Sequence, residues 1–202
     1  MAASSPQVNE AGRPPINSTP TERTATDITA SARLLRGRAL PALRLRRHDG
    51  GFADPVAAPT PYTVLYLYPG AYARRAAYPA GWAGIPGATG CTRQSCAYRD
   101  RLADFRAAGA TVHGVSTQPP HEQAEFATKQ RLRFPLLSDA ELALATALGL
   151  PTFRVAGTPR LHRLTLVVDR DRTIREVVSG DTDLAASVDR ALAAVLAAPR
   201  RG

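Results

Sequence analysis

Seven consecutive uncharged residues, Tyr62 to Tyr68 (YTVLYLY), predict a strand in the interior of a sheet. Aromatic and β-branched residues favour strands, and a run without polar alternation is typical of a strand buried on both faces. Such a strand needs helices packed above and below its sheet. Strand and helix patterns alternate along the rest of the chain and end in a hairpin and a helix. We therefore expect an α/β sandwich, with a central mixed β-sheet flanked by helices.

Local patterns and turn residues place the other elements around this strand. An edge strand is expected at 40–45, and a loop rich in Gly, Pro, Ala and Tyr runs from Pro69 to Gly90. The helix after that loop has Cys96, Leu102 and Phe105 as its apolar markers. The remaining strands are expected at 111–116, 161–168 and 173–178, and the helices at 91–108, 121–131, 140–148 and 181–197.

The chain divides into an N-terminal extension and one domain. Residues 1–32 are expected to be a disordered extension, because Ser, Thr, Pro, Ala and Asn bury too little apolar surface to offset their ordering entropy. The extension lacks the apolar core of a secretory signal, and no stretch of the chain approaches the roughly 20 apolar residues of a membrane span. We expect a cytoplasmic protein with one domain at 33–198, which carries a long loop insert at about 70–89.

Composition excludes several classes of protein. The net charge of +9 in 202 residues comes almost wholly from arginine, since lysine occurs once, and it is spread over loops, tail and edges. Without a clustered basic face we expect no nucleic-acid partner, and a basic nucleic-acid-associated protein is a minor alternative. Two cysteines exclude a disulfide scaffold and a four-cysteine zinc site. We expect no metal or organic cofactor, because the histidines are dispersed: His48, His113, His121 and His162.

The chemistry centres on a cysteine at the predicted start of a helix. Cys91 follows Gly90 where the loop enters the helix at 91–108. Free backbone N–H groups and the positive end of the helix dipole favour a thiolate there. A thiolate can attack a peroxide oxygen, which forms a sulfenic acid that a second thiol condenses to a disulfide. The alternative is that both cysteines are ordinary buried apolar residues.

Cys96 is the second thiol, five residues further along the helix. Five residues give about 7.5 Å of rise and place the Cα atoms roughly 8–9 Å apart. A disulfide needs Cα atoms within about 7 Å. If the two sulfurs pair, the first turns of the helix must therefore unwind.

Several segments in consistent order resemble the peroxiredoxins, and most of all the peroxiredoxin Q (bacterioferritin comigratory protein) group. The likeness covers about residues 40 to 178. It is carried by VLYLYP (64–69), GCTRQSCAYRD (90–100), AGATVHGVSTQ (108–118), FPLLSD (134–139) and HRLTLVVDRDRTI (162–174). The resemblance implies a thioredoxin-like fold. It also implies that Cys91 is the peroxidatic cysteine, that Cys96 is the resolving cysteine of an intrahelical disulfide, and that Arg163 lies over the reactive sulfur.

The loop before Cys91 departs from the family pattern. The family has a threonine three residues before the cysteine, whereas position 88 is alanine and the nearest hydroxyl belongs to Thr89. Either Thr89 holds the peroxide or backbone N–H groups replace it, and we favour Thr89 because the reaction needs an acceptor for the peroxide proton. Pro86 and Gly90 are expected to complete the substrate site. The insert aromatics either line the active site or a docking surface, or pack within the loop: Tyr72, Tyr78 and Trp82.

The sequence thus predicts an antioxidant thiol peroxidase of cell redox homeostasis. It would reduce hydrogen peroxide or organic hydroperoxides through a redox-active Cys91–Cys96 disulfide. By family analogy thioredoxin or another dithiol is the reductant. A monomer is the default, with a dimer as the alternative. The competing function is a redox-sensing or interaction protein that uses the same cysteines without efficient turnover.

Overall fold

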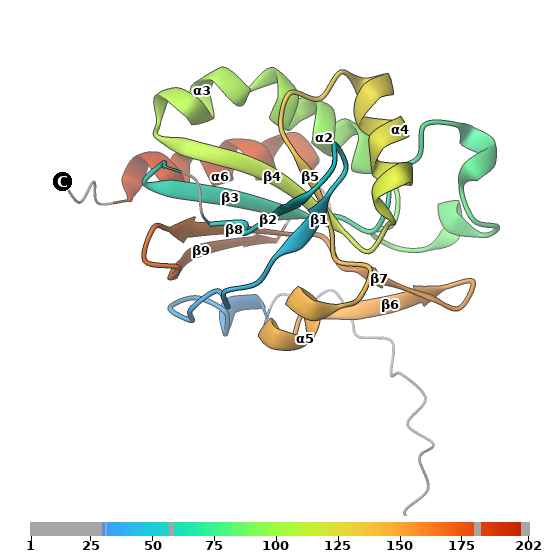
Figure 1. Ribbon diagram of the computed structural model, residues 1–202, viewed down its shortest axis with the longest axis horizontal. Helices are drawn as coiled ribbons and strands as arrows, with labels where there is room; N and C mark the ends of the chain where they lie inside the picture. The colour runs from blue at the N-terminus through green and yellow to red at the C-terminus, as the bar shows by residue number, and fades with distance from the viewer. Residues whose placement is uncertain (1–29, 31, 57–58, 180–182, 199–202) are drawn as a thin grey trace, which may run out of the picture.

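A seven-stranded mixed sheet forms the centre of the molecule (Figure 1). The computed structural model describes residues 30, 32–56, 59–179 and 183–198, so almost all of the predicted extension lies outside the described residues. The strand order is β2-β1-β5-β4-β3-β8-β9. The strands are β1 (Leu45–Arg47), β2 (Phe52–Ala53), β3 (Tyr62–Leu67), β4 (Ala110–Ser116), β5 (Leu136–Ser138), β8 (Leu164–Asp169) and β9 (Ile174–Ser179).

Strand β3 is the interior strand that its composition predicts. It pairs with β4 in parallel and with β8 in antiparallel register, and all of its residues are buried. Successive side chains alternate between the two faces. Val64 and Tyr66 belong to one apolar core, and Leu65 and Leu67 belong to the other. The prediction of a mixed sheet with a core on each face is therefore confirmed.

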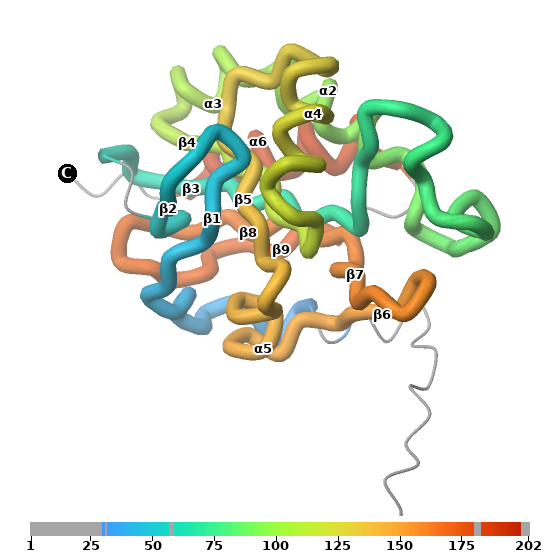
Figure 2. Tube along the Cα trace, turned by 45° about the vertical axis from the view of Figure 1, so that its right-hand side comes forward, coloured from blue at the N-terminus to red at the C-terminus, as the bar shows by residue number. Residues whose placement is uncertain are grey.

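Helices cover both faces of this sheet (Figures 1 and 2). The core that contains Tyr66 is closed by side chains of α2, α3, α4 and α6, and the core that contains Leu65 is closed by α5 and by residues 32–45. Ala32, at the end of the predicted extension, is buried in this second core. The helices are α2 (Cys91–Asp100), α3 (Leu102–Ala107), α4 (Pro120–Gln130), α5 (Ala143–Leu148) and α6 (Leu184–Ala197). No helix in the described part of the chain has the length and apolar character that crossing a membrane requires.

The prediction of one continuous helix over 91–108 is wrong, because the helix is interrupted at Arg101. This residue has φ −97° and ψ 8°, which separates α2 from α3. Its guanidinium bonds to Asp104 of α3 and to Asp189 of α6. Cys96 is only half-buried, and Tyr98 instead fills the core from this helix.

The strand predicted over 161–168 is shorter than expected, and Leu161 at its predicted start belongs to a different strand. Residues Thr152–Val155 (β6) and Thr158–Leu161 (β7) form a separate antiparallel hairpin, and β8 starts only at Leu164. Arg163 lies in the connection between β7 and β8. Two other elements begin later than expected: the strand predicted at 40–45 starts at Leu45, and the helix predicted at 140–148 starts at Ala143 after Leu142 with φ 58°. The prediction of an edge position for the first of these is wrong, because β1 pairs with β2 on one side and with β5 on the other.

A buried histidine in β4 gives a testable dependence of stability on pH. Burial, aided by the charge of Arg47, lowers the pKa of His113 from 6.5 to about 4. Because the unfolded chain takes up this proton near pH 6.5 and the folded protein only near pH 4, stability falls as pH drops between these values. From pH 7 to 5.5 we expect the free energy of unfolding to fall by about 1 kcal/mol, measured in urea. In His113→Gln this part of the pH dependence should vanish. An equal change of the free energy of unfolding with pH in both proteins would contradict the assignment to His113.

Candidate active site

Cys91 is the first residue of α2 and is buried at 2% exposure in the core shared with Tyr68 and Ala71. Gly90 precedes it with φ 91°, a left-handed conformation that glycine adopts without strain. A Cβ at Gly90 would lie 2.5 Å from Leu184 Cδ1 of α6, so the helix packs closely on this turn. No side chain in the described part of the chain caps the start of α2, so its first backbone N–H groups have no capping partner there. Gly90 therefore forms the turn from which α2 begins at Cys91, and its role in substrate binding stays a prediction.

Arg163 reaches the sulfur of Cys91 from the β7–β8 connection. Its Nη2 donates to Cys91 Sγ at 3.3 Å, and the residue is buried, with 2% exposed. The same Nη2 donates to the carbonyl oxygens of Thr89 (2.8 Å) and Gly87 (3.2 Å), and Nη1 donates to Gln94 Oε1. Arg163 forms no ion pair with an Asp or Glu among the described residues. Its charge is thus surrounded by neutral acceptors and the sulfur.

Gln94 is a site residue that the sequence interpretation missed. It is fully buried, and its Nε2 has no hydrogen-bond partner among the described residues. Gln94 lies three residues after Cys91, and residues with this spacing share one face of a helix. The spacing was therefore a usable signal for a polar side chain beside the sulfur.

Cys96 faces a different part of the molecule. It is half-buried, and its Sγ lies 3.6 Å from Gln130 Oε1 of α4. Both cysteines are free thiols within one intact helix. The structure therefore brings Arg163 to Cys91 but holds Cys96 apart from both, as expected before any unwinding of α2.

The structure brings the backbone of Thr89 into the site and leaves its side chain outside. Thr89 is exposed, and its carbonyl oxygen accepts from Arg163. Its hydroxyl makes no hydrogen bond to the described residues. Pro86 is exposed, whereas Ala88 is buried and its carbonyl oxygen accepts from Cys91 Sγ at 3.3 Å. This geometry favours the alternative in which backbone N–H groups hold the peroxide.

Thr89→Val is accordingly expected to leave kcat/KM for hydrogen peroxide within about twofold of the native value. Valine keeps the shape of threonine and the carbonyl that Arg163 uses, and it removes only the hydroxyl. Initial rates of peroxide consumption measure the effect. A loss of kcat/KM of tenfold or more would show that the Thr89 hydroxyl takes part in the reaction.

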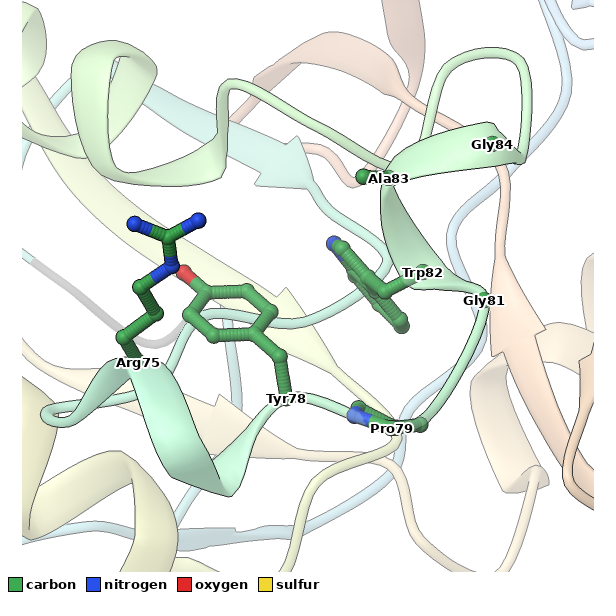
Figure 3. A pocket seen from close by; sticks show the side chains of 7 residues that line it. All are labelled: Arg75, Tyr78, Pro79, Gly81, Trp82, Ala83 and Gly84. Atoms are coloured by element: carbon green, nitrogen blue, oxygen red, sulfur yellow. The ribbon is translucent and has the colours of Figure 1, made fainter.

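The insert aromatics form a cluster against the β6–β7 hairpin. Trp82 packs with Ala88 and Val155, and the rings of Tyr72 and Tyr78 contact it edge-on or tilted at 6.0 and 5.8 Å between centroids. Two short 3₁₀ turns, η1 (Arg75–Ala77) and η2 (Trp82–Gly84), shape the insert. Tyr78 and Trp82 line a cavity of about 360 Å³ together with Arg75 (Figure 3). The insert is thus a packed structure with its own cavity.

No group of three or more His, Cys, Asp or Glu side chains gathers as a metal site in the described ranges of the chain. The protein has a mixed β-sheet with helices on both faces, and a buried thiol at the first residue of a helix contacts an arginine that has no acidic partner among the described residues. This combination is typical of a thiol-based oxidoreductase. The fold and the site therefore define this class of enzyme.

Comparison with known proteins shows to which family of thiol-based oxidoreductases the chain belongs. Residues 82–177 match the model of the AhpC/TSA family. A peroxiredoxin of Mycobacterium tuberculosis strain H37Rv is 36% identical over 108 residues, which cover 54% of this chain and 70% of the relative. A second one from that strain is 32% identical and covers 73% of this chain and 86% of the relative. Peroxiredoxin Q of Populus jackii chloroplasts is 29% identical, with 81% and 69% covered.

Solved structures agree with these sequence comparisons. The crystal structure of peroxidoxin BcpB from Mycobacterium tuberculosis has a TM-score of 0.66 at 30% identity and covers 83% of this chain and 98% of that one. Peroxiredoxin Q of Xanthomonas campestris has a TM-score of 0.59 at 26% identity, with 77% and 93% covered. The chain belongs to the peroxiredoxin family. It is a thiol-dependent peroxidase with a thioredoxin-like fold, as its sequence motifs predict.

Proposed function

We propose that the protein reduces hydrogen peroxide and organic hydroperoxides with Cys91 as the peroxidatic nucleophile. The observation that carries this assignment is the 3.3 Å contact between Arg163 Nη2 and Cys91 Sγ in a buried site. The Cys91 thiolate attacks the outer oxygen of the peroxide, so that an S–O bond forms while the O–O bond breaks. The leaving oxygen takes a proton and departs as water or an alcohol, and the sulfur becomes a sulfenic acid. Arg163 stabilises the negative charge on the sulfur and then on the leaving oxygen.

Cys96 is the proposed resolving cysteine. Its thiolate attacks the Cys91 sulfenic sulfur, which forms the disulfide and releases water. The separation of the two thiols within α2 requires the first turns of the helix to unwind for this step. Unwinding exposes the Cys91–Cys96 disulfide to an external dithiol of the thioredoxin type, which returns both cysteines to thiols. We propose that the protein acts as a monomer, with a dimer as the alternative, and that it works in the cytoplasm, a reducing compartment that sustains turnover.

Mass spectrometry after one equivalent of hydrogen peroxide tests this sequence of steps. Wild-type protein should lose two hydrogens and yield a peptide linked by the Cys91–Cys96 disulfide. Cys96→Ser should instead carry one added oxygen on Cys91, which a dimedone probe captures. Unmodified Cys91 in both proteins would refute the proposed nucleophile. A sulfenic acid that persists in the wild type would refute the resolving role of Cys96.

Repeated turnover separates a peroxidase from a redox sensor. With thioredoxin, thioredoxin reductase and NADPH, the wild-type protein should consume many equivalents of peroxide. Cys96→Ser should stall after the first. A wild-type protein that also stalls after one equivalent would favour the sensor function that shares these cysteines.

A further inference from the structure

Arg160 of β7 is a buried cation that has no negative partner among the described residues. The residue is 6% exposed, and only its Nη2 has a hydrogen-bond partner, the hydroxyl of Tyr72 at 2.9 Å. Its Nε and Nη1 are buried with no hydrogen-bond partner among the described residues. An unpaired buried charge costs several kcal/mol in effective desolvation penalty, so proteins normally pair such groups. The arrangement therefore points to a negatively charged ligand.

The groups around Arg160 are mainly hydrogen-bond donors. The Tyr72 hydroxyl accepts from Arg160 and keeps its own hydrogen to donate. Trp82 has its ring 6.0 Å from the Arg160 guanidinium carbon, and its Nε1 is likewise buried without a partner in the part of the chain that the structure describes. Glu122, whose charge acts on Tyr72, accepts from Gln118 and forms no ion pair with Arg160 within the described ranges. A cation with surrounding donors favours an anion such as a carboxylate.

This cluster lies beside the peroxidatic cysteine. Arg160 precedes Arg163 by three residues, and Arg163 contacts Cys91. Ala71, next to Tyr72, shares the core of Cys91, and its backbone is held at both ends by Gln118. Burial raises the pKa of Tyr72, Arg160 opposes this rise, and the charge of Cys91 adds to it. An anion at Arg160 would therefore belong to a molecule whose other end is within reach of the sulfur.

Trp82 connects the cluster to the cavity in the insert. Tyr78 and Trp82, whose rings are 5.8 Å apart between centroids, both line this cavity, whose volume of about 360 Å³ suits a small organic molecule (Figure 3). Because Arg160 Nε and Nη1 are buried, an anion must displace a neighbouring group to reach them, and the Trp82 ring is the neighbour that also lines the cavity. Trp82 is also the one tryptophan of the chain, so its fluorescence reports such a movement directly.

We propose that Arg160, Tyr72 and Trp82 form a subsite for the carboxylate of an organic hydroperoxide, whose apolar body lies against the aromatic insert. The subsite would make the enzyme prefer anionic hydroperoxides over neutral ones of the same shape. This substrate class rests on the proposed peroxidase reaction at Cys91, whereas binding of the carboxylate itself does not.

Binding is tested first, without a reaction. Titration of the wild-type protein with 4-isopropylbenzoate should change Trp82 fluorescence with saturation. The uncharged amide of the same shape should bind at least about tenfold more weakly, because it lacks the charge that strengthens the bond to a buried guanidinium. Equal affinity for acid and amide would overturn the proposal.

Matched variants assign the effect to Arg160. Arg160→Met should bind acid and amide alike. Arg154→Met removes an exposed arginine from the same hairpin and should retain the preference for the acid. Retention of the preference in Arg160→Met would overturn the assignment. If this variant does not fold, the comparison of acid and amide on the wild-type protein still decides whether a carboxylate subsite exists.

Turnover then links the subsite to the reaction. The kcat/KM for para-carboxylated cumene hydroperoxide should exceed that for its methyl ester by at least about tenfold. Equal values, with both compounds reduced, would refute the substrate preference and leave the peroxidase function standing. No reduction of any hydroperoxide, together with tight binding of the acid, would refute the peroxidase function and leave the anion site.

Discussion

Arg163→Met is expected to lower kcat/KM for hydrogen peroxide by about 10²- to 10³-fold, the range found when a donor to developing negative charge is removed from an active site. Methionine fills a similar volume but cannot donate to Cys91 Sγ, and it leaves the carbonyl oxygens of Gly87 and Thr89 without their shared donor. The rate of the first oxidation step, followed by rapid mixing with peroxide, measures the effect.

Two control variants show whether the loss of activity comes from the charge and hydrogen bonds of Arg163 or from the removal of any arginine. Arg163→Lys keeps the charge but lacks the fork that bonds to sulfur and carbonyl oxygens together, so its activity should lie between those of wild type and Arg163→Met. Arg154→Met, at an exposed position, should react like the wild type. Near-native activity of Arg163→Met would show that Arg163 is not needed for the reaction.

Gly114→Ala is expected to lower the free energy of unfolding by about 3 kcal/mol and Tm by roughly 6–12 °C, at the upper end of the range for overpacked cores. A Cβ at Gly114 would lie 2.6 Å from Leu136 Cδ2 and from Tyr66 Cζ and Oη. The Tyr66 ring stacks on Tyr68 and Tyr98 at 5.6 and 4.5 Å between centroids, so it has little freedom to move. Urea denaturation measures the loss.

Gly84→Ala is the matched control, because a Cβ there has no atom within 4 Å among the described residues and its φ is not in the left-handed region. It should change stability by less than about 0.5 kcal/mol. A similarly small change in Gly114→Ala would show that the sheet adjusts around Tyr66 more readily than the close contacts indicate.

The sequence predicted features that depend on local patterns. The uncharged run of β3 identified the centre of the sheet, and Gly90 before Cys91 identified the start of α2. The β6–β7 hairpin was missed because its strands are only four residues long and partly exposed, with Pro159 inside one of them. The break at Arg101 was missed because both sides of it have helical composition and the residue itself favours helices.

The site shows the same limit. Sequence motifs identified Cys91, Cys96 and Arg163. Gln94 could have been identified as well, because its spacing of three residues from Cys91 places it on the same face of the helix. The Tyr72–Arg160 contact joins residues 88 positions apart, and it depends on how the insert packs on the hairpin. The hydroxyl of Thr89 was favoured because the chemistry needs an acceptor, but the turn at Gly90 directs the carbonyl rather than the side chain of Thr89 toward Arg163.

The break at Arg101 limits how far a change in α2 can spread. Unwinding that begins at Cys91 reaches, after ten residues, Arg101, whose backbone departs from the helical conformation and whose side chain is bonded to α3 and α6. The Phe105 side chain of α3 remains in its core beyond that point. Under the proposed mechanism, oxidation should therefore speed amide hydrogen exchange in residues 91–100 and leave that of 102–107 at its resting rate, so that the break would separate a segment that changes in each cycle from one that does not.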